Sequence, residues 1–200
     1  MPLVIALSIS AGLRKHPGMK QPAETLTSGQ VELRRWRVSD VETLNRVVTE
    51  SLAHLLPWMP WAASHDRNAI AAYLTRSEGE WESAQAYNYA ITSGGAVIGS
   101  CSLMRRIGPG GLEIGYWIHP GWTGRGLVTM SAAALLRQGF ELAEIDRIEI
   151  HHDAANHASG AVPRRLGFTE VERFQVPDGP ATPGEVGIDV IWRIQSPAAQ

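Results

Sequence analysis

The chain has 200 residues, of which 44% are hydrophobic and 19% are charged, so it suits one globular domain and excludes long disordered regions. The formal net charge of −2 and the isoelectric point near 6.4 exclude the basic footprint of a nucleic-acid-binding domain, whose isoelectric point lies above about 9. The single cysteine, Cys101, excludes a disulfide framework and a cysteine-based zinc site, and it fits a reducing cytoplasm.

The chain opens with an apolar run at residues 3–13 that is similar to the core of a secretion signal. Its positive residues, Arg14 and Lys15, follow the run, whereas a secretion signal carries them before it. The run is also shorter than the roughly 20 apolar residues that span a bilayer. We therefore expect residues 1–30 to be an N-terminal extension outside the fold, with Met19 as an alternative start of translation.

From residue 31 onward, short β-rich runs alternate with segments of helical periodicity. Side chains alternate over residues 31–37 as they do in a half-buried strand, and Ser39 followed by Glu42 predicts a helix start through a capping box. Apolar residues at helical spacing predict a second helix over residues 67–83. Further strands are predicted at residues 87–91, 96–105 and 112–118, with TSGG and IGPGG as the turns between them.

The second half of the chain begins with a long helix. Apolar residues recur every three or four positions from Leu127 to Ala143, which predicts one buried stripe. The elements predicted after it are a strand at 147–152, a helix at 156–166, and strands at 168–176 and 186–194. This order indicates the α/β class, with a mixed sheet in which three consecutive strands form an antiparallel meander.

The segment HPGWTGRGL, at residues 119–127, places three glycines and an arginine directly before the long helix. The first amides of a helix lack intrahelical partners and lie at the positive end of its dipole, so backbone alone can hold an anion there. Glycine lets a phosphate approach closely, and Arg125 adds a positive charge suited to a phosphoryl oxygen. The glycine spacing differs from the Walker loop and from the dinucleotide fingerprint, which disfavours ATP, GTP and NAD.

The loop resembles the pyrophosphate loop of the GNAT superfamily of acyl-CoA N-acyltransferases, with Gly124, Arg125 and Gly126 at the matching positions. Gly121 stands where the family prefers glutamine or arginine. The preceding LEIGYWIHP, the later NHASGAVPRRLGF and the tryptophan-rich LLPWMPWA resemble segments of the RimJ/RimL-like branch. The resemblance covers residues 31–193.

The resemblance implies a single-domain GNAT-like fold, with a mixed, mostly antiparallel central sheet that is splayed between two strands and flanked by helices. It places this domain at residues 31–194 and leaves 195–200 as a tail. The pantetheine arm of acetyl-CoA would insert between the strands at 112–118 and 147–152. The residues implied to hold acetyl-CoA are Trp117, Ile118, Thr123, Gly124, Arg125, Gly126, Leu127, Val128, Asn156 and Ser159.

The implied reaction is direct transfer of the acetyl group to a primary amine in a ternary complex. An α-amine, with a pKa of about 7.7–8.0, needs only a modest base, whereas a lysine-like amine near 10.4 needs more help. Glu113 is the candidate base because it points opposite Leu112 and Ile114 on an alternating strand, the alternative being a solvent-facing or salt-bridged glutamate. Many superfamily members protonate the leaving thiolate with a tyrosine at the position of Pro163, so Ser159 is the candidate acid here, or it only binds.

Two further features of the sequence bear on ligands. Trp58 and Trp61 flank Pro60 and are expected to line the acceptor pocket, the alternative being that they fill the core beneath a loop. The segment HHDAANH at residues 151–157 contains zinc-ligand types, but adjacent strand residues point to opposite faces, so no metal site is expected.

The expected function is a cytoplasmic N-acetyltransferase that uses acetyl-CoA and acts on a protein N-terminus, as in ribosomal-protein acetylation, or on a small-molecule amine. A larger donor such as succinyl-CoA and a homodimer are left open. Two other classes are also left open: a non-catalytic CoA-binding or regulatory module, and an interaction protein that uses the Trp58 and Trp61 surface. No nucleic-acid or membrane partner is expected.

Overall fold

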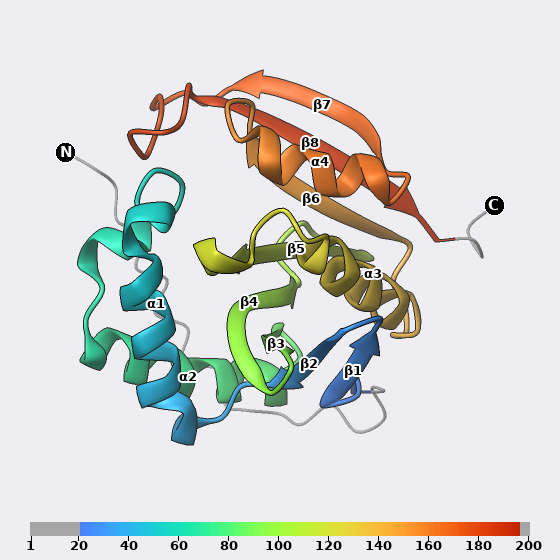
Figure 1. The fold of residues 1–200 in the computed structure, drawn as a ribbon. Helices are drawn as coiled ribbons and strands as arrows, with labels where there is room; N and C mark the ends of the chain where they lie inside the picture. The colour runs from blue at the N-terminus through green and yellow to red at the C-terminus, as the bar shows by residue number, and fades with distance from the viewer. Residues whose placement is uncertain (1–20, 197–200) are drawn as a thin grey trace.

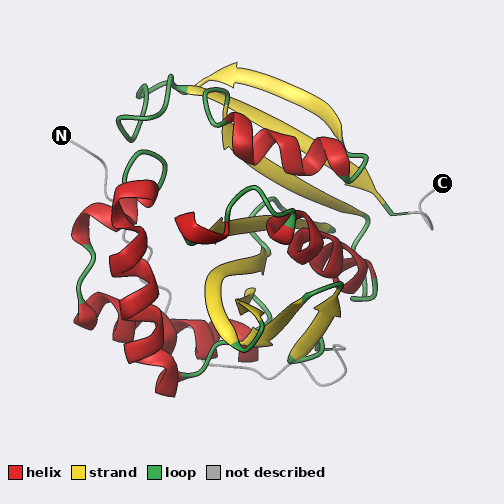
Figure 2. Cartoon of the chain, in the orientation of Figure 1, coloured by secondary structure: helices red, strands yellow, loops and turns green. Residues whose placement is uncertain are grey.

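The computed structural model describes residues 21–196, so the apolar run at residues 3–13 and Met19 lie outside the described residues. In the described part, one sheet carries α-helices on both faces (Figures 1 and 2). The strands are β1 (Thr25–Ser28), β2 (Val31–Arg35), β3 (Ala86–Ser93), β4 (Ala96–Met104), β5 (Gly111–Ile118), β6 (Arg147–Asp153), β7 (Thr169–Gln175) and β8 (Ile188–Gln195). The α-helices are α1 (Val41–Leu55), α2 (Arg67–Glu82), α3 (Leu127–Phe140) and α4 (His157–Arg165).

The eight strands lie in the order β1-β2-β3-β4-β5-β6-β8-β7. Every neighbouring pair is antiparallel except β5 and β6, which are parallel. The predicted meander is confirmed as β3, β4 and β5, and β8 returns to lie between β6 and β7. The predicted class, a mixed and mostly antiparallel sheet flanked by helices, is therefore confirmed.

Each face of the sheet has its own hydrophobic core. On one face, α3 buries its predicted apolar stripe, including Leu127, Ala132 and Leu135, against β4, β5 and β6. On the other face, α1 and α2 pack Leu44 and Leu74 against the sheet. Because burying one leucine side chain stabilises by about 1.5–3 kcal/mol, the two layers hold the sheet firmly on both sides. No helix within residues 21–196 has the length and hydropathy that a bilayer crossing requires.

The start of the first helix differs from the prediction. The capping box predicted from Ser39 and Glu42 is wrong, because α1 begins at Val41 after a short 3-10 turn. The carboxylate of Asp40 accepts the backbone amide of Arg37 at 2.9 Å, so Asp40 organises this turn in place of Ser39.

The sheet begins at β1, inside the segment that we expected to be an extension at residues 1–30. Gly29 adopts a φ of +58°, a left-handed conformation that glycine takes freely, and the chain turns back so that Ser28 pairs with Val31. A four-residue edge strand is too short for hydrophobic periodicity to reveal it.

The short pairing between β5 and β6 is the feature that positions the site. It covers only Gly111–Glu113 on β5 and Arg147–Glu149 on β6. Beyond it, residues 114–118 pair with β4 alone among the described strands, while β6 continues along β8. The sheet therefore opens between β5 and β6, as the predicted splay requires (Figure 1).

Candidate active site

Two cavities meet at the opening between β5 and β6. The α2 cavity, of about 1180 Å³, lies on the face covered by α1 and α2. The α3 cavity, of about 1070 Å³, lies beside the N-terminal ends of α3 and α4. Both are lined by Trp58, Met59, Tyr116, Trp117, Asn156 and Ser159. Ligands bound in the two cavities would therefore contact some of the same residues.

The glycine loop before α3 lines the α3 cavity. Gly124 and Gly126 adopt φ values of +73° and +74°, and Gly126 is the N-cap of α3. The loop is exposed, and no described group accepts a hydrogen bond from the backbone amides of Gly124, Arg125 or Gly126. With the first-turn amides of Leu127 and Val128, they offer a set of donors at a helix N-terminus, which suits an anion.

Side chains brace this loop from within. The guanidinium of Arg125 donates to the carbonyl oxygen of Gly121 at 2.9 Å and stacks over the Trp122 ring, 4.8 Å from its centroid. The hydroxyl of Thr123 donates to the carbonyl oxygen of Pro120 at 2.9 Å. These contacts fix the backbone of the loop and leave the amides of Gly124 and Gly126 without a described acceptor.

The residues predicted to hold the pantetheine arm border the opening. Trp117 and Ile118 pair with β4 through Ser100 and Gly99, and their other edge faces the opening. Asn156 is the N-cap of α4 and accepts the backbone amide of Ser159 at 3.0 Å. The structure thus brings together the predicted donor-binding residues of β5, the glycine loop and α4 around the α3 cavity.

Tyr116 lines both cavities, a position that the sequence did not reveal. Its hydroxyl lies 3.0 Å from the carbonyl oxygen of Ser159, to which it donates, and 3.2 Å from the Ser159 hydroxyl. Burial raises the pKa of Tyr116 to about 12, although its contact with Ser159 opposes this, so the phenol keeps its proton at neutral pH. A hydroxyl pair therefore bridges the opening from β5 to α4, the helix in which Pro163 stands at the position of the tyrosine of the resembled family.

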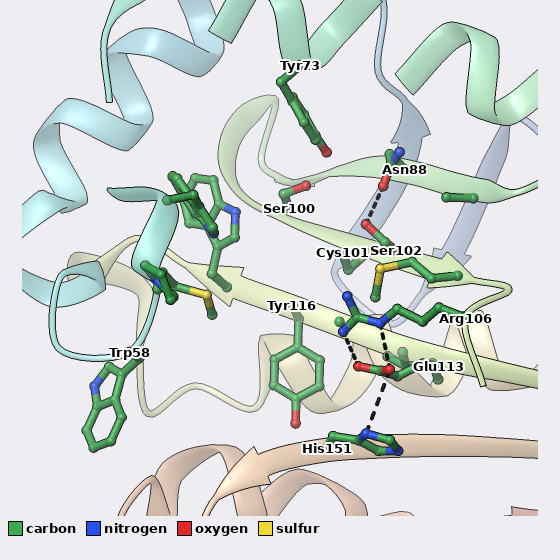
Figure 3. A pocket seen from close by; sticks show the side chains of 18 of the residues that line it. Trp58, Tyr73, Asn88, Ser100, Cys101, Ser102, Arg106, Glu113, Tyr116 and His151 are labelled. Carbon is green, nitrogen blue, oxygen red and sulfur yellow. Dashed lines mark hydrogen bonds and ion pairs between the residues drawn. The ribbon is translucent and has the colours of Figure 1, made fainter. Parts of the chain in front are cut away.

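The two predicted tryptophans both lie at the α2 cavity. Trp58 follows α1 and also borders the α3 cavity, whereas Trp61 is 42% exposed and packs against Trp117 with a ring-centroid distance of 6.3 Å. Figure 3 shows Trp58 on one side of this cavity and Tyr73 pointing toward Ser100 at another. The cavity therefore combines an aromatic wall with a polar end.

Glu113 lies on the β5 face that lines the α2 cavity, at the last pair with β6. Its side chain is 6% exposed, and Arg106 donates to both of its carboxylate oxygens, with Nε 2.7 Å from Oε2. The Nδ1 atom of His151 lies 3.8 Å from Oε2 (Figure 3). The structure therefore shows the buried, ion-paired arrangement, and a base role for Glu113 stays a prediction.

Asp153, at the end of β6, anchors the loop that leads into β8. Its carboxylate accepts the backbone amides of Ala155 at 2.8 Å and Gly187 at 2.8 Å, and those of Val186 and Ile188 at 3.1 and 3.2 Å. Burial alone would raise the pKa of this carboxyl, but the four amide donors outweigh it and lower the pKa below its ordinary value. The anchored loop holds Glu185 at the rim of the α2 cavity.

The two adjacent histidines of β6 have separate partners. His151 lies 2.7 Å from Glu149, and His152 bonds the carbonyl of Asp153 at 2.7 Å and Nε1 of Trp192 at 3.0 Å. Within residues 21–196, no group of three or more histidine, cysteine, aspartate or glutamate side chains is arranged to hold a metal ion.

Comparison with known proteins identifies a family and a relative for this chain. The sequence pattern of the acetyltransferase (GNAT) domain family matches residues 30–169. YdaF of Bacillus subtilis (strain 168), a protein provisionally named a ribosomal N-acetyltransferase, is 41% identical over 58 residues. This match covers 29% of the chain and 32% of YdaF, so it spans about a third of that curated relative.

Solved structures with the same fold span nearly the whole chain. RimL, a ribosomal L7/L12 α-N-protein acetyltransferase in complex with coenzyme A, has a TM-score of 0.80 at 23% identity, covering 88% of this chain and 100% of RimL. Mycobacterium smegmatis RimJ, in complex with a coenzyme A disulfide, has a TM-score of 0.78 at 22% identity, covering 88% of this chain and 90% of RimJ. At these identities the likeness establishes the fold.

Proposed function

We propose that this chain, which belongs to the GNAT acetyltransferase family, transfers an acetyl group from acetyl-CoA to a primary amine. The observation that carries the proposal is the meeting of the two cavities at the opening between β5 and β6, where they share Tyr116, Trp117 and Ser159. A donor in one cavity and an acceptor in the other would present their reacting atoms to each other without a covalent enzyme intermediate.

Acetyl-CoA is the donor that the α3 cavity suits. The amides of the loop around Gly124 and of the first turn of α3 would hold its pyrophosphate. The open edge of β5 at Trp117 and Ile118 would hold the pantetheine arm and polarise the thioester carbonyl. Asn156 would bond the same arm from the start of α4.

The chemistry requires one proton to leave the amine and one to reach the sulfur. The neutral nitrogen attacks the thioester carbon, the C–N bond forms, and the C–S bond breaks to release the CoA thiolate. A base in the wall of the α2 cavity would remove the proton, and Glu113 is the residue predicted for this role from the sequence. Ser159 would protonate the thiolate. The Tyr116 hydroxyl, 3.2 Å from the Ser159 hydroxyl, would turn from the Ser159 carbonyl to return a proton to Ser159, and solvent would restore the phenol.

The acceptor that we propose first is a protein N-terminal α-amine, and a small-molecule amine is the second. The names of RimL and YdaF support ribosomal-protein acetylation, and an α-amine needs the least assistance from a base. Trp58 and Trp61 would form the wall against which the first residues of the acceptor pack. The proposed setting is the cytoplasm, where the buried free thiol of Cys101 stays reduced.

A thermal-shift titration with acetyl-CoA, succinyl-CoA, free CoA, ATP and NAD tests the donor assignment. A ligand that binds only the native state stabilises by about 2.7 kcal/mol at 100 times its Kd, which raises Tm by about 5–10 °C in a domain of this size. Only CoA species should shift Tm, and the preferred thioester then enters a screen of amines with thiol release as the readout. Shifts without thiol release would instead establish a non-catalytic CoA-binding module, and no shift would refute the proposal.

A further inference from the structure

His151 lies on β6 two residues beyond the last pair between β5 and β6, where the sheet has opened. Its side chain is 28% exposed and lines the α2 cavity, on the same strand face as Glu149. The position places an imidazole beside the proposed acceptor and beside Glu113, whose Oε2 is 3.8 Å from Nδ1.

The contact with Glu149 determines which ring nitrogen carries the proton. Glu149 is buried, accepts Nε of Arg193 at 2.7 Å, and lies 2.7 Å from Nε2 of His151. Burial alone would raise the pKa of Glu149, but the bonds from His151 and Arg193 outweigh it and lower the pKa. An ionised carboxylate only accepts hydrogen bonds, so Nε2 carries the hydrogen and Nδ1 keeps its lone pair.

Glu113 and His151 differ in how free they are to take a proton. Both oxygens of Glu113 already accept hydrogen bonds from Arg106, so a proton on this carboxylate would compete with a charge-assisted ion pair. Nδ1 of His151 accepts no hydrogen bond from the described residues, and its residue lines the cavity together with Glu113, whose Oε2 lies 3.8 Å away. Of the two groups, His151 therefore offers the available lone pair.

We propose that His151 is the general base that takes the proton from the acceptor amine, and that Glu149 is the positioning residue that fixes its tautomer. The inference rests on the proposed function. As the C–N bond forms, the proton moves from the attacking nitrogen to Nδ1, directly or through one water. The resulting imidazolium lies between the carboxylates of Glu113 and Glu149, which stabilise its charge. In this arrangement the ion pair with Arg106 holds Glu113 in place beside the imidazolium.

The charged groups around His151 come from every neighbouring strand. They are Glu113 on β5 with Arg106, Arg147 and Glu149 on β6, and Asp189 and Arg193 on β8. Glu113 and Glu149 contact the ring, and Arg106, Arg147 and Arg193 contact those carboxylates, so protonation adds one charge next to two acids.

The kinetic test uses His151→Gln with ethylamine and its mono-, di- and trifluoro derivatives as acceptors, because each fluorine lowers basicity with little change in size. With ethylamine we expect kcat/KM to fall about 10²–10⁴-fold. With trifluoroethylamine, which is neutral without help, the loss should shrink to less than about tenfold. Glu149→Gln should lower kcat while leaving acetyl-CoA affinity unchanged.

His152→Gln is the matched control, because both ring nitrogens of His152 are already engaged. It should keep the wild-type dependence of kcat/KM on the acceptor amine. An equal loss in His151→Gln for all four amines would overturn the proposal.

A measurement that needs no turnover keeps the inference separate from the proposed function. Nitrogen-15 NMR of the histidine rings should show the neutral ring of His151 protonated on Nε2 and bare on Nδ1. A neutral ring with its proton on Nδ1 would refute the base role even in an active enzyme. A wild-type protein that binds no CoA species and acetylates no amine would refute the proposed function instead.

Discussion

Replacing Gly124 by aspartate tests where the pyrophosphate binds. A Cβ at this position would meet no atom within 4 Å, so the new side chain fits, and its φ of +73° is one that aspartate tolerates better than most residues. Two unit charges 4 Å apart repel by about 4 kcal/mol at an effective dielectric constant of 20. Because the loop is exposed and screened, we expect a smaller effect, a loss of acetyl-CoA affinity of about 10²-fold.

Two control variants separate charge from backbone strain. Gly124→Asn has nearly the same shape without the charge and should lose far less affinity. Gly179→Asp has a matching φ of +75° and equally open surroundings, but it borders neither cavity, so it should leave acetyl-CoA affinity unchanged. Titration calorimetry at low and high salt provides the assay, and the defect of Gly124→Asp should shrink as salt rises. A folded Gly124→Asp protein that binds acetyl-CoA as Gly179→Asp does would refute our placement of the pyrophosphate.

Three other variants test the hydroxyl pair, the anchored loop and the aromatic wall. Tyr116→Phe should lower kcat at least tenfold and leave the acetyl-CoA Kd unchanged in steady-state and binding assays; an unchanged kcat would remove the hydroxyl from the mechanism. Asp153→Asn should lower the free energy of unfolding by about 2–4 kcal/mol in urea, since at least one amide loses its acceptor. The folded pKa of Asp153 is lowered, so its contribution is present above the ordinary carboxyl pKa of about 4 and is lost as pH falls below it. The urea curves of the two proteins should therefore converge in acid, and a constant gap from pH 7 to pH 3 would contradict this origin. Trp61→Ala should raise the acceptor KM about tenfold without changing acetyl-CoA affinity; an unchanged KM would show that Trp61 only covers the core.

Local patterns in the sequence predicted most of the fold. Turn glycines and alternating strands located β3, β4 and β5, and the stripe from Leu127 located α3. The return of β8 between β6 and β7 was not predictable, because strand order depends on contacts between distant segments. The capping-box prediction was wrong because the carboxylate of Asp40 accepts a hydrogen bond from the backbone amide of Arg37, which forms a 3-10 turn at the predicted helix start.

The sequence likewise predicted some parts of the candidate site and not others. The glycine loop could be predicted because its left-handed backbone conformations favour glycine at two nearby positions, Gly124 and Gly126. Tyr116 was missed because a strand tyrosine is typical of a core, and its partner Ser159 is 43 positions away. The ion pair between Arg106 and Glu113 could not be predicted either, because no spacing rule connects an arginine in a turn to a glutamate in a strand.

The short junction between β5 and β6 also bears on how the protein holds itself together. The strands β6, β7 and β8 form their own antiparallel ladder, which α4 covers, and this body joins the rest of the sheet through Gly111–Glu113. The ladder at this boundary is short, and the shared hydrophobic core, which includes Leu112 and Ile148, holds the two parts together beside it. Acetyl-CoA bound along the open edge would add contacts to both parts, so the cosubstrate would serve the enzyme as a structural element for as long as it is bound.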